Sequence, residues 1–215
     1  MTDSIRRVCV YCASSEQVDK AYLDAARQLG ELLAKNSITV VYGGGAIGLM
    51  GRLADGVLAN DGHVIDVIPR FMQELEWDHR GLTELQVVED MRERKHVMLT
   101  GSDAAIALPG GSGTLEELLE AITLKRLGIY LQPIVLVNIL GFFDPLLALF
   151  ERCIREHFMD ERHAAMWQVA DRPEDVLAAM QSQAPWTARA RVRHAAARKA
   201  ICLDFTFIAS TPTCK

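Results

Sequence analysis

The sequence has no long apolar run and no leader-like N-terminus. No apolar stretch approaches the ~20 residues that a membrane-spanning helix requires. The N-terminus also lacks the apolar core of roughly 7–15 residues that precedes the cleavage site of a signal peptide. These absences predict a protein that has no membrane partner.

Cysteine is scarce and its count is odd. The five cysteines, at positions 9, 12, 153, 202 and 214, show no spacing typical of a disulfide framework, which favours the reducing cytoplasm. Cys9 and Cys12 have the C-x-x-C spacing of redox motifs, but they fall within a predicted strand rather than at a helix start. Because side chains alternate along a strand, we expect the two sulfurs to be buried on opposite faces.

Patterns that bind metals or nucleoside triphosphates are missing. The six histidines form no H-x-x-x-H or similar ligand set, and no second C-x-x-C pair occurs. The glycine-rich segment Gly110–Thr114 lacks the lysine with which a Walker A loop grips terminal phosphates. We therefore expect neither a metal nor a cofactor.

Positive charge is sparse over most of the chain. The net charge is −5, but residues 1–183 carry 17 basic and 27 acidic residues, whereas residues 184–215 carry six basic residues and one acid. An acidic body disfavours a broad nucleic-acid surface, which needs a basic face. We expect no nucleic-acid partner, and the basic run near the C-terminus is typical of a solvated helix face.

The 215 residues, half of them apolar, suit one α/β domain. Apolar β-branched runs alternate with helical patterns, which predicts a doubly wound, Rossmann-like parallel sheet with helices on both faces. The domain is expected over residues 1–183, and residues 184–215 form a C-terminal extension of unknown role, because Pro185 and Trp186 break the pattern. The predicted strands are 7–12, 38–42, 63–68, 83–88, 104–108 and 134–138, and the predicted helices are 19–35, 47–60, 90–101, 114–127, 144–158 and 172–181.

A first glycine-rich loop, Gly43–Gly48, matches the G-x-G-x-x-G pattern between a strand and a helix. Asp66 in the next strand imitates the acid that binds a ribose in NAD-dependent enzymes. However, the dinucleotide pattern normally follows the first strand rather than the second, and Asp66 lies in mid-strand. A tight turn that allows close helix–strand packing remains an alternative interpretation.

A second glycine-rich loop, Pro109–Gly113, leaves an apolar strand and enters a helical pattern. Backbone N–H groups of such a loop, together with the helix N-terminus behind it, suit a phosphate. Thr114 and Glu117 have the S/T-x-x-E spacing of a capping box, in which each satisfies a backbone donor of the other. Their pattern alone leaves helix capping and catalysis both open.

A charged segment, Met91–Lys95, opens another predicted helix. Asp90 and Glu93 have the spacing of a second capping box. Arg92, Arg94 and Lys95 offer a guanidinium or an ammonium to a phosphate. Solvated surface is the alternative interpretation of this charge run.

Three motifs together resemble the Lonely Guy (LOG) family. They are YGGGAIGLMG at 42–51, MRERK at 91–95 and PGGSGTLEE at 109–117, within a resemblance that spans residues 6 to 181. The resemblance implies a Rossmann-like homodimer that hydrolyses the N-glycosidic bond of cytokinin riboside 5′-monophosphates, and of AMP in bacterial members. Many members carry an older label, lysine decarboxylase, but nothing in this sequence resembles a pyridoxal phosphate site.

The resemblance also implies a role for individual residues. Arg94 and Glu117 match the catalytic pair. The positions that match the phosphate loop and the other walls of the nucleotide site are Gly110, Gly111, Gly113, Thr114, Gly43, Gly44, Gly45, Lys95, Met91 and Ser14. The sequence departs from the family pattern at Ala13, Arg92, Ser112 and Leu124–Arg126, which puts base preference and dimer contacts in question.

Two other functional classes remain open. A nucleotide-binding or cofactor-carrier protein of the same fold would have no turnover and would not need the pair Arg94 and Glu117. An NAD-linked oxidoreductase would follow if Gly43–Gly48 held a dinucleotide.

Overall fold

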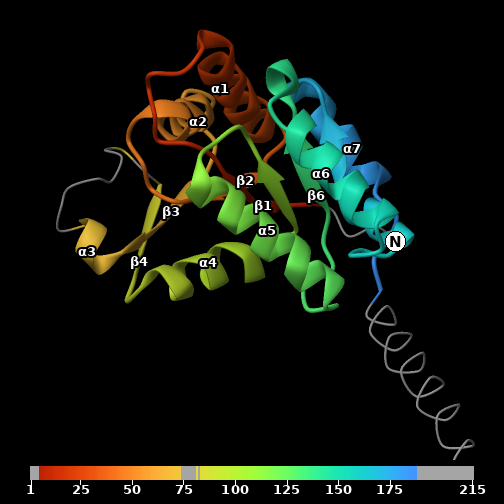
Figure 1. Ribbon diagram of the computed structural model, residues 1–215. Coiled ribbons are helices and arrows are strands. Elements are labelled where there is room, and N and C mark those ends of the chain that lie inside the picture. The colour runs from red at the N-terminus through yellow and green to blue at the C-terminus, as the bar shows by residue number, and fades with distance from the viewer. Residues whose placement is uncertain (1–4, 74–80, 82, 188–215) are drawn as a thin grey trace, which may run out of the picture.

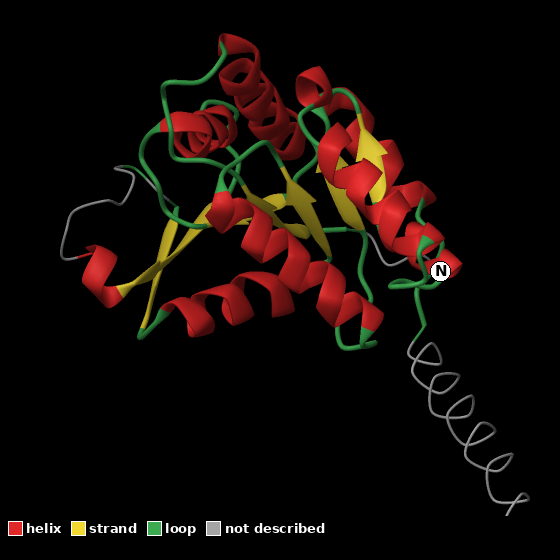
Figure 2. Ribbon diagram, in the orientation of Figure 1, coloured by secondary structure: helices red, strands yellow, loops and turns green. Residues whose placement is uncertain are grey.

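The computed structural model describes residues 5–73, 81 and 83–187. In this part of the chain strands and helices alternate, and the sheet lies between two layers of helices (Figure 1, Figure 2). The strands are β1 (Arg7–Tyr11), β2 (Thr39–Tyr42), β3 (Val64–Pro69), β4 (Glu84–Val88), β5 (Ala104–Ala107), β6 (Ile134–Val137) and β7 (Gln168–Ala170). The helices are α1 (Lys20–Lys35), α2 (Gly48–Leu58), α3 (Arg70–Gln73), α4 (Met91–Thr100), α5 (Ser112–Arg126), α6 (Asp144–Arg155) and α7 (Val176–Ser182).

All of these strands pair in parallel, in the order β4-β3-β2-β1-β5-β6-β7. The chain moves outward from β1 to β4, then returns to the other side of β1 with β5. The strand order therefore reverses between β1 and β5, where the register aligns Val8 with Ala104 and Tyr11 with Ala107. The predicted doubly wound sheet is confirmed, and its switch point is the place where such folds bind ligands.

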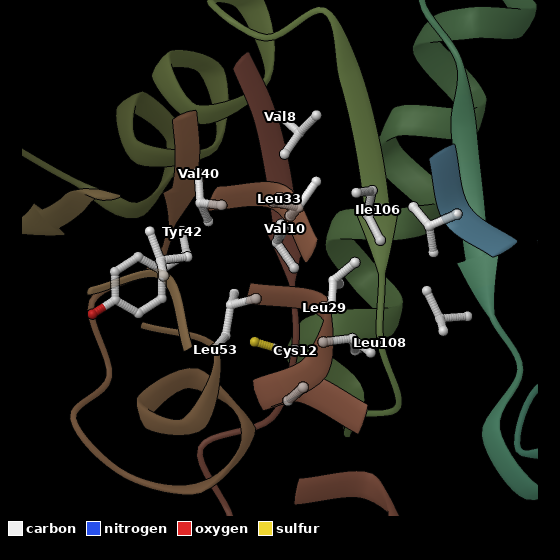
Figure 3. Packing of buried hydrophobic residues seen from close by; sticks show 14 of the residues in the cluster. Val8, Val10, Cys12, Leu29, Leu33, Val40, Tyr42, Leu53, Ile106 and Leu108 are labelled. Atoms are coloured by element: carbon white, nitrogen blue, oxygen red, sulfur yellow. The ribbon is translucent and has the colours of Figure 1, made fainter. Parts of the chain in front are cut away.

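Two apolar layers hold the helices to the sheet. Side chains of α1 and α2 pack on one face with Val8, Val10 and Cys12 (Figure 3). Side chains of α7 belong to the same cluster. Side chains of α4, α5 and α6 pack on the other face with Cys9. The expectation that the two cysteines are buried on opposite faces is thus confirmed, and burial raises the pKa of both thiols well above its usual value.

Several boundaries differ from the sequence-based expectation. β7 was missed because it has only three residues, too few to show a periodic pattern. The predicted helix 172–181 is a 3₁₀ turn, Pro173–Asp175, followed by α7. Trp186 packs against the cluster under α5, so the packed unit continues past residue 183. Most of the proposed C-terminal extension, from residue 188 onward, lies outside the described residues.

Within the described ranges, none of the helices has the length and apolar character needed to cross a membrane.

Candidate active site

Three loops meet at the carboxyl ends of the central strands. The loop after β1 carries Ser14, which is exposed, and its backbone packs against Gly48 at the start of α2. Met50 N–H also donates to the carbonyl of Ala13, over 3.1 Å. The loop after β1 is therefore fixed to the start of α2, next to the switch point.

The loop after β2 uses its glycines to approach two charged side chains. A Cβ on Gly43 would overlap the guanidinium of Arg94, and a Cβ on Gly44 would overlap the carboxylate of Asp66. Gly44 also has a φ of 78°, a conformation that glycine adopts at little cost. Asp66 is completely buried beneath this loop, in keeping with the objection that an acid in mid-strand is poorly placed to bind a ribose.

Arg94 comes from the first turns of α4. Asp90 caps this helix, since its carboxylate accepts from the N–H groups of Arg92 and Glu93, both over 2.8 Å. The other half of the predicted capping box differs, because the Glu93 carboxylate accepts from the N–H of Glu89. The cap fixes the start of α4 and thereby the direction in which Arg94 leaves it.

The Arg94 side chain is buried, and none of the carboxylates in the described part of the chain forms an ion pair with it. Its Nη2 donates to the carbonyl of Gly43 over 3.0 Å, and its Nη1 lies 3.5 Å from the sulfur of Met91. Its Nε is buried and has no hydrogen-bond partner among the described residues. A guanidinium that forms no ion pair within the described ranges can interact with an anionic ligand.

The second glycine-rich loop ends in α5, which begins at Ser112. Gly111 is the N-cap and supplies no side-chain bond, so the predicted capping box of Thr114 and Glu117 is wrong: both residues lie within the helix. Thr114 is instead buried beneath Gly110, where a Cβ would overlap its side chain. The first N–H groups of α5 have no side-chain cap and suit an anion.

Gly111 and Gly113 have a different environment from Gly110. A Cβ at either position would meet no atom of the described chain within 4 Å. Packing within the described chain therefore does not require glycine at these two positions. A ligand that approaches the backbone closely would require it.

Glu117 lies one turn into α5 and is 8% exposed. Burial raises its pKa to about 7, and the nearby Arg94 guanidinium opposes this rise. Arg94 and Glu117 form no salt bridge, although both belong to the described part of the chain. The pair therefore consists of a guanidinium that is not ion-paired to Glu117 and a carboxyl group with a pKa of about 7, a combination typical of active sites.

The remaining predicted residues of the site are placed around this pair. Met91 is exposed beside Arg94. Lys95 points to α5, where it binds Glu116 and, over 2.8 Å, Glu120. Sequence reasoning missed Glu120, although its i,i+4 spacing from Glu116 places both acids on one face of the helix.

A metal site is not evident in the described segments, which hold no cluster of three or more histidine, cysteine, aspartate or glutamate side chains.

A cavity of about 860 Å³ lies at the amino ends of the strands, lined by Ile5, Ile38 and Lys125 among others. This is the end of the sheet opposite to Arg94 and Glu117. A groove of about 380 Å³ between α4 and α5 borders the site and is lined by Lys95, His96, Leu99 and Glu120 among others.

A doubly wound sheet with two glycine-rich loops and a buried cation–carboxyl pair at its switch point defines a Rossmann-type protein with an enzyme-like site. The family model described as "Possible lysine decarboxylase" matches residues 50–180. A probable cytokinin riboside 5′-monophosphate phosphoribohydrolase of Oryza sativa subsp. japonica is 41% identical over 180 residues, 84% of this chain and 72% of the relative. A cytokinin riboside 5′-monophosphate phosphoribohydrolase of Arabidopsis thaliana is 40% identical over 180 residues, 84% of either chain. The chain belongs to the LOG family.

Solved structures support the fold independently. The molybdenum cofactor binding protein of Rippkaea orientalis gives a TM-score of 0.64 at 22% identity, covering 84% of this chain and 98% of that chain. The molybdenum cofactor carrier protein of Chlamydomonas reinhardtii gives a TM-score of 0.65 at 20% identity, with the same coverage. At these identities the similarity establishes the shared fold alone.

Proposed function

We propose that this protein hydrolyses the N-glycosidic bond of nucleoside 5′-monophosphates, releasing the free base and ribose 5-phosphate. The observation that carries the proposal is the pair of Arg94 and Glu117, two buried ionisable groups from different helices, next to the glycine-rich loops. The names of the curated relatives supply the substrate class, cytokinin riboside 5′-monophosphates.

The phosphate of the substrate would bind at the N-terminus of α5. Gly111 and Gly113 leave the backbone accessible, and the first N–H groups of the helix carry partial positive charge. Holding the phosphate there places the ribose toward Glu117, one turn further along the helix. This anchoring uses backbone groups, so we propose that the reaction needs no metal or other cofactor.

Glu117 would act on the sugar carbon that bears the base. As the bond from C1′ to the base nitrogen breaks, positive charge develops on the sugar, and a carboxylate stabilises it. The electron pair of the broken bond leaves with the base. A water oxygen then bonds to C1′ and gives one proton to Glu117, and Glu117 returns this proton to the nitrogen of the departing base. A carboxyl group with a pKa of about 7 is suited to accept and return a proton at neutral pH.

Arg94 would keep part of the Glu117 carboxyl groups ionised and would orient the substrate. The guanidinium lowers the pKa of Glu117 against the effect of burial, so a fraction of the carboxyl groups is ionised at neutral pH. Its Nε, buried without a partner, offers a further donor toward a phosphate or a base.

We extend the proposal to the substrate range and the assembly. AMP and N6-substituted AMP share the same phosphoribosyl group, so both would be cleaved. A homodimer is supported by apolar side chains exposed on and beside the two helices that border the site: Met91, Leu119, Leu127 and Ile129. The free thiols of Cys9, Cys12 and Cys153 are consistent with the reducing cytoplasm.

The proposed domain boundary moves slightly. We place the end of the catalytic domain after Trp186 rather than at residue 183, because Trp186 packs on the core. A truncation after Thr187 should keep the activity and the melting temperature of the full chain.

The decisive experiment is release of base from AMP and from isopentenyl-AMP, without added cofactor and with EDTA present. We expect turnover by the full-length protein, and loss of at least roughly 100-fold in Glu117→Ala and Arg94→Ala with an unchanged circular dichroism spectrum. Glu151→Ala, on the exposed face of α6, is the matched control and should behave like the wild type. Tight nucleotide binding without turnover would instead support the carrier alternative.

A further inference from the structure

Lys95 joins the two helices that carry the candidate catalytic pair. Its Nζ binds the carboxylates of Glu116 and Glu120, the latter over 2.8 Å. The Lys95 side chain is only 18% exposed. Both α4 and α5 are fully described, and the polar contacts between them are the two made by Lys95. Arg94 contacts Gly43 and Met91 and makes no hydrogen bond to α5.

The arrangement follows from two pairs of neighbours in the sequence. Arg94 and Lys95 are consecutive on α4, and Glu116 and Glu117 are consecutive on α5. Successive residues of an α-helix point about 100° apart, since a turn contains ~3.6 residues. One member of each pair is therefore buried, namely Arg94 and Glu117, while Lys95 and Glu116 meet nearer the surface.

Lys95 is poorly suited to bind a phosphate directly. Its ammonium is already shared by two carboxylates, and this raises its pKa above the usual value. With Glu116 and Glu120 the group carries a net charge of −1, which repels an anion. Two neighbouring residues of the charged segment 91–95 therefore have different roles. Arg94 belongs to the candidate catalytic pair, whereas Lys95 binds the carboxylates of α5.

We propose that Lys95 is a positioning residue, whose bridge to Glu116 and Glu120 holds Arg94 and Glu117 at the separation that the reaction requires. This inference rests on the proposed function, because its effect on the rate presupposes that the protein hydrolyses nucleoside 5′-monophosphates. A partly exposed ion pair contributes little to stability, whereas a small displacement of catalytic groups costs a large factor in rate. Loss of the bridge should therefore reduce turnover far more than it reduces the melting temperature.

The first test compares Lys95→Met with Lys95→Arg. We expect Lys95→Met to lower kcat at least ten-fold, to change KM less than three-fold, and to raise the pH at which kcat is half-maximal, because Lys95 lowers the pKa of Glu117. Lys95→Arg should retain most of the activity, since a guanidinium also reaches two carboxylates. Lys20→Met, which removes an exposed i,i+4 pair with Asp24 on α1, is the matched control and should leave kcat unchanged.

The second test breaks the bridge and leaves Lys95 in place. The double variant Glu116→Gln/Glu120→Gln should lower kcat as Lys95→Met does. If Lys95 were a phosphate ligand, the double variant would bind substrate as well or better, and Lys95→Met would raise KM ten-fold with kcat retained. That pair of results would overturn the proposal.

A third measurement does not depend on turnover. Amide hydrogen exchange over residues 91–100 should be faster in Lys95→Met than in the wild type, at an unchanged melting temperature and with no change in α1. Unchanged exchange would overturn the positioning role. Absence of base release by the wild-type protein would overturn the proposed function alone, because the exchange comparison still tests the bridge.

Discussion

Gly43 and Arg94 occupy positions that depend on each other. The guanidinium donates to the carbonyl of Gly43 over 3.0 Å and fills the space where a side chain at residue 43 would lie. Glycine in the loop after β2 is therefore needed to make room for a buried arginine as well as to form a tight turn. This relationship joins two segments that are 51 residues apart in the sequence.

Gly43→Ala should displace Arg94 and lower kcat/KM by roughly 100-fold, because a shift of about 1 Å in a catalytic group has an effect of this size. Steady-state kinetics of base release measures it. Gly101→Ala at the other end of α4, where the atoms nearest to an added Cβ belong to the flexible end of Arg7 at 3.3 Å, is the control and should keep the wild-type rate. Equal rates in both variants would contradict the role assigned to this contact.

Gly111→Ala and Gly110→Ala should separate ligand binding from packing. At Gly111 a Cβ meets no described atom and φ is −82°, so alanine should leave the melting temperature unchanged but raise KM about ten-fold by obstructing the phosphate. At Gly110 a Cβ would overlap Thr114, so alanine should destabilise the fold by about 1–3 kcal/mol. Thermal unfolding and kinetics of both variants provide the test, and an unchanged KM in Gly111→Ala would exclude a phosphate at this loop.

The rate of the reaction should depend on the ionisation of Glu117. Its pKa is about 7 and the proposed mechanism uses the carboxylate, so kcat/KM should rise with pH through about 7 and fall as the group is protonated below it. Arg94→Met, if its residual activity is measurable, should move this limb to higher pH, because the guanidinium lowers the pKa of Glu117. A profile that falls through pH 7 would mean that Glu117 acts in its protonated form.

Glu117 should also lower the stability of the fold at alkaline pH. Its pKa is about 7 in the folded protein and 4.5 when the side chain is fully solvated, as in the unfolded chain. Ionisation of Glu117 therefore does not destabilise the folded state below pH 4.5, and its destabilising effect is complete above pH 7. The rise in the pKa of Glu117 corresponds to a loss of about 3 kcal/mol in the free energy of unfolding. Glu117→Gln should therefore unfold at a higher denaturant concentration than the wild type at pH 8, with a smaller difference at pH 5, while losing activity. Equal pH dependence in both proteins would show that Glu117 is not buried as described.

The alternation of elements and the C-x-x-C motif could be interpreted correctly from local patterns. Strand and helix periods depend on neighbouring residues, and side-chain alternation along a strand places Cys9 and Cys12 without further information. The interpretation of Thr114 and Glu117 as a capping box failed because α5 begins at Ser112, and a shift of two residues in a helix start is beyond what local propensity can decide. The contact of Gly44 with the Asp66 carboxylate could not be predicted in this way, because it joins two separate segments.

The sequence by itself determined the doubly wound sheet, the two glycine-rich loops and the family motifs that include Arg94 and Glu117, since these depend on short-range periodicity and spacing. Only the tertiary structure decided which neighbours act together. Burial of Glu117 raises its pKa, contact with Gly43 places Arg94, and two acids from α5 engage Lys95. These properties arise from distances between segments remote in sequence and from removal of charge from water, neither of which a linear pattern contains.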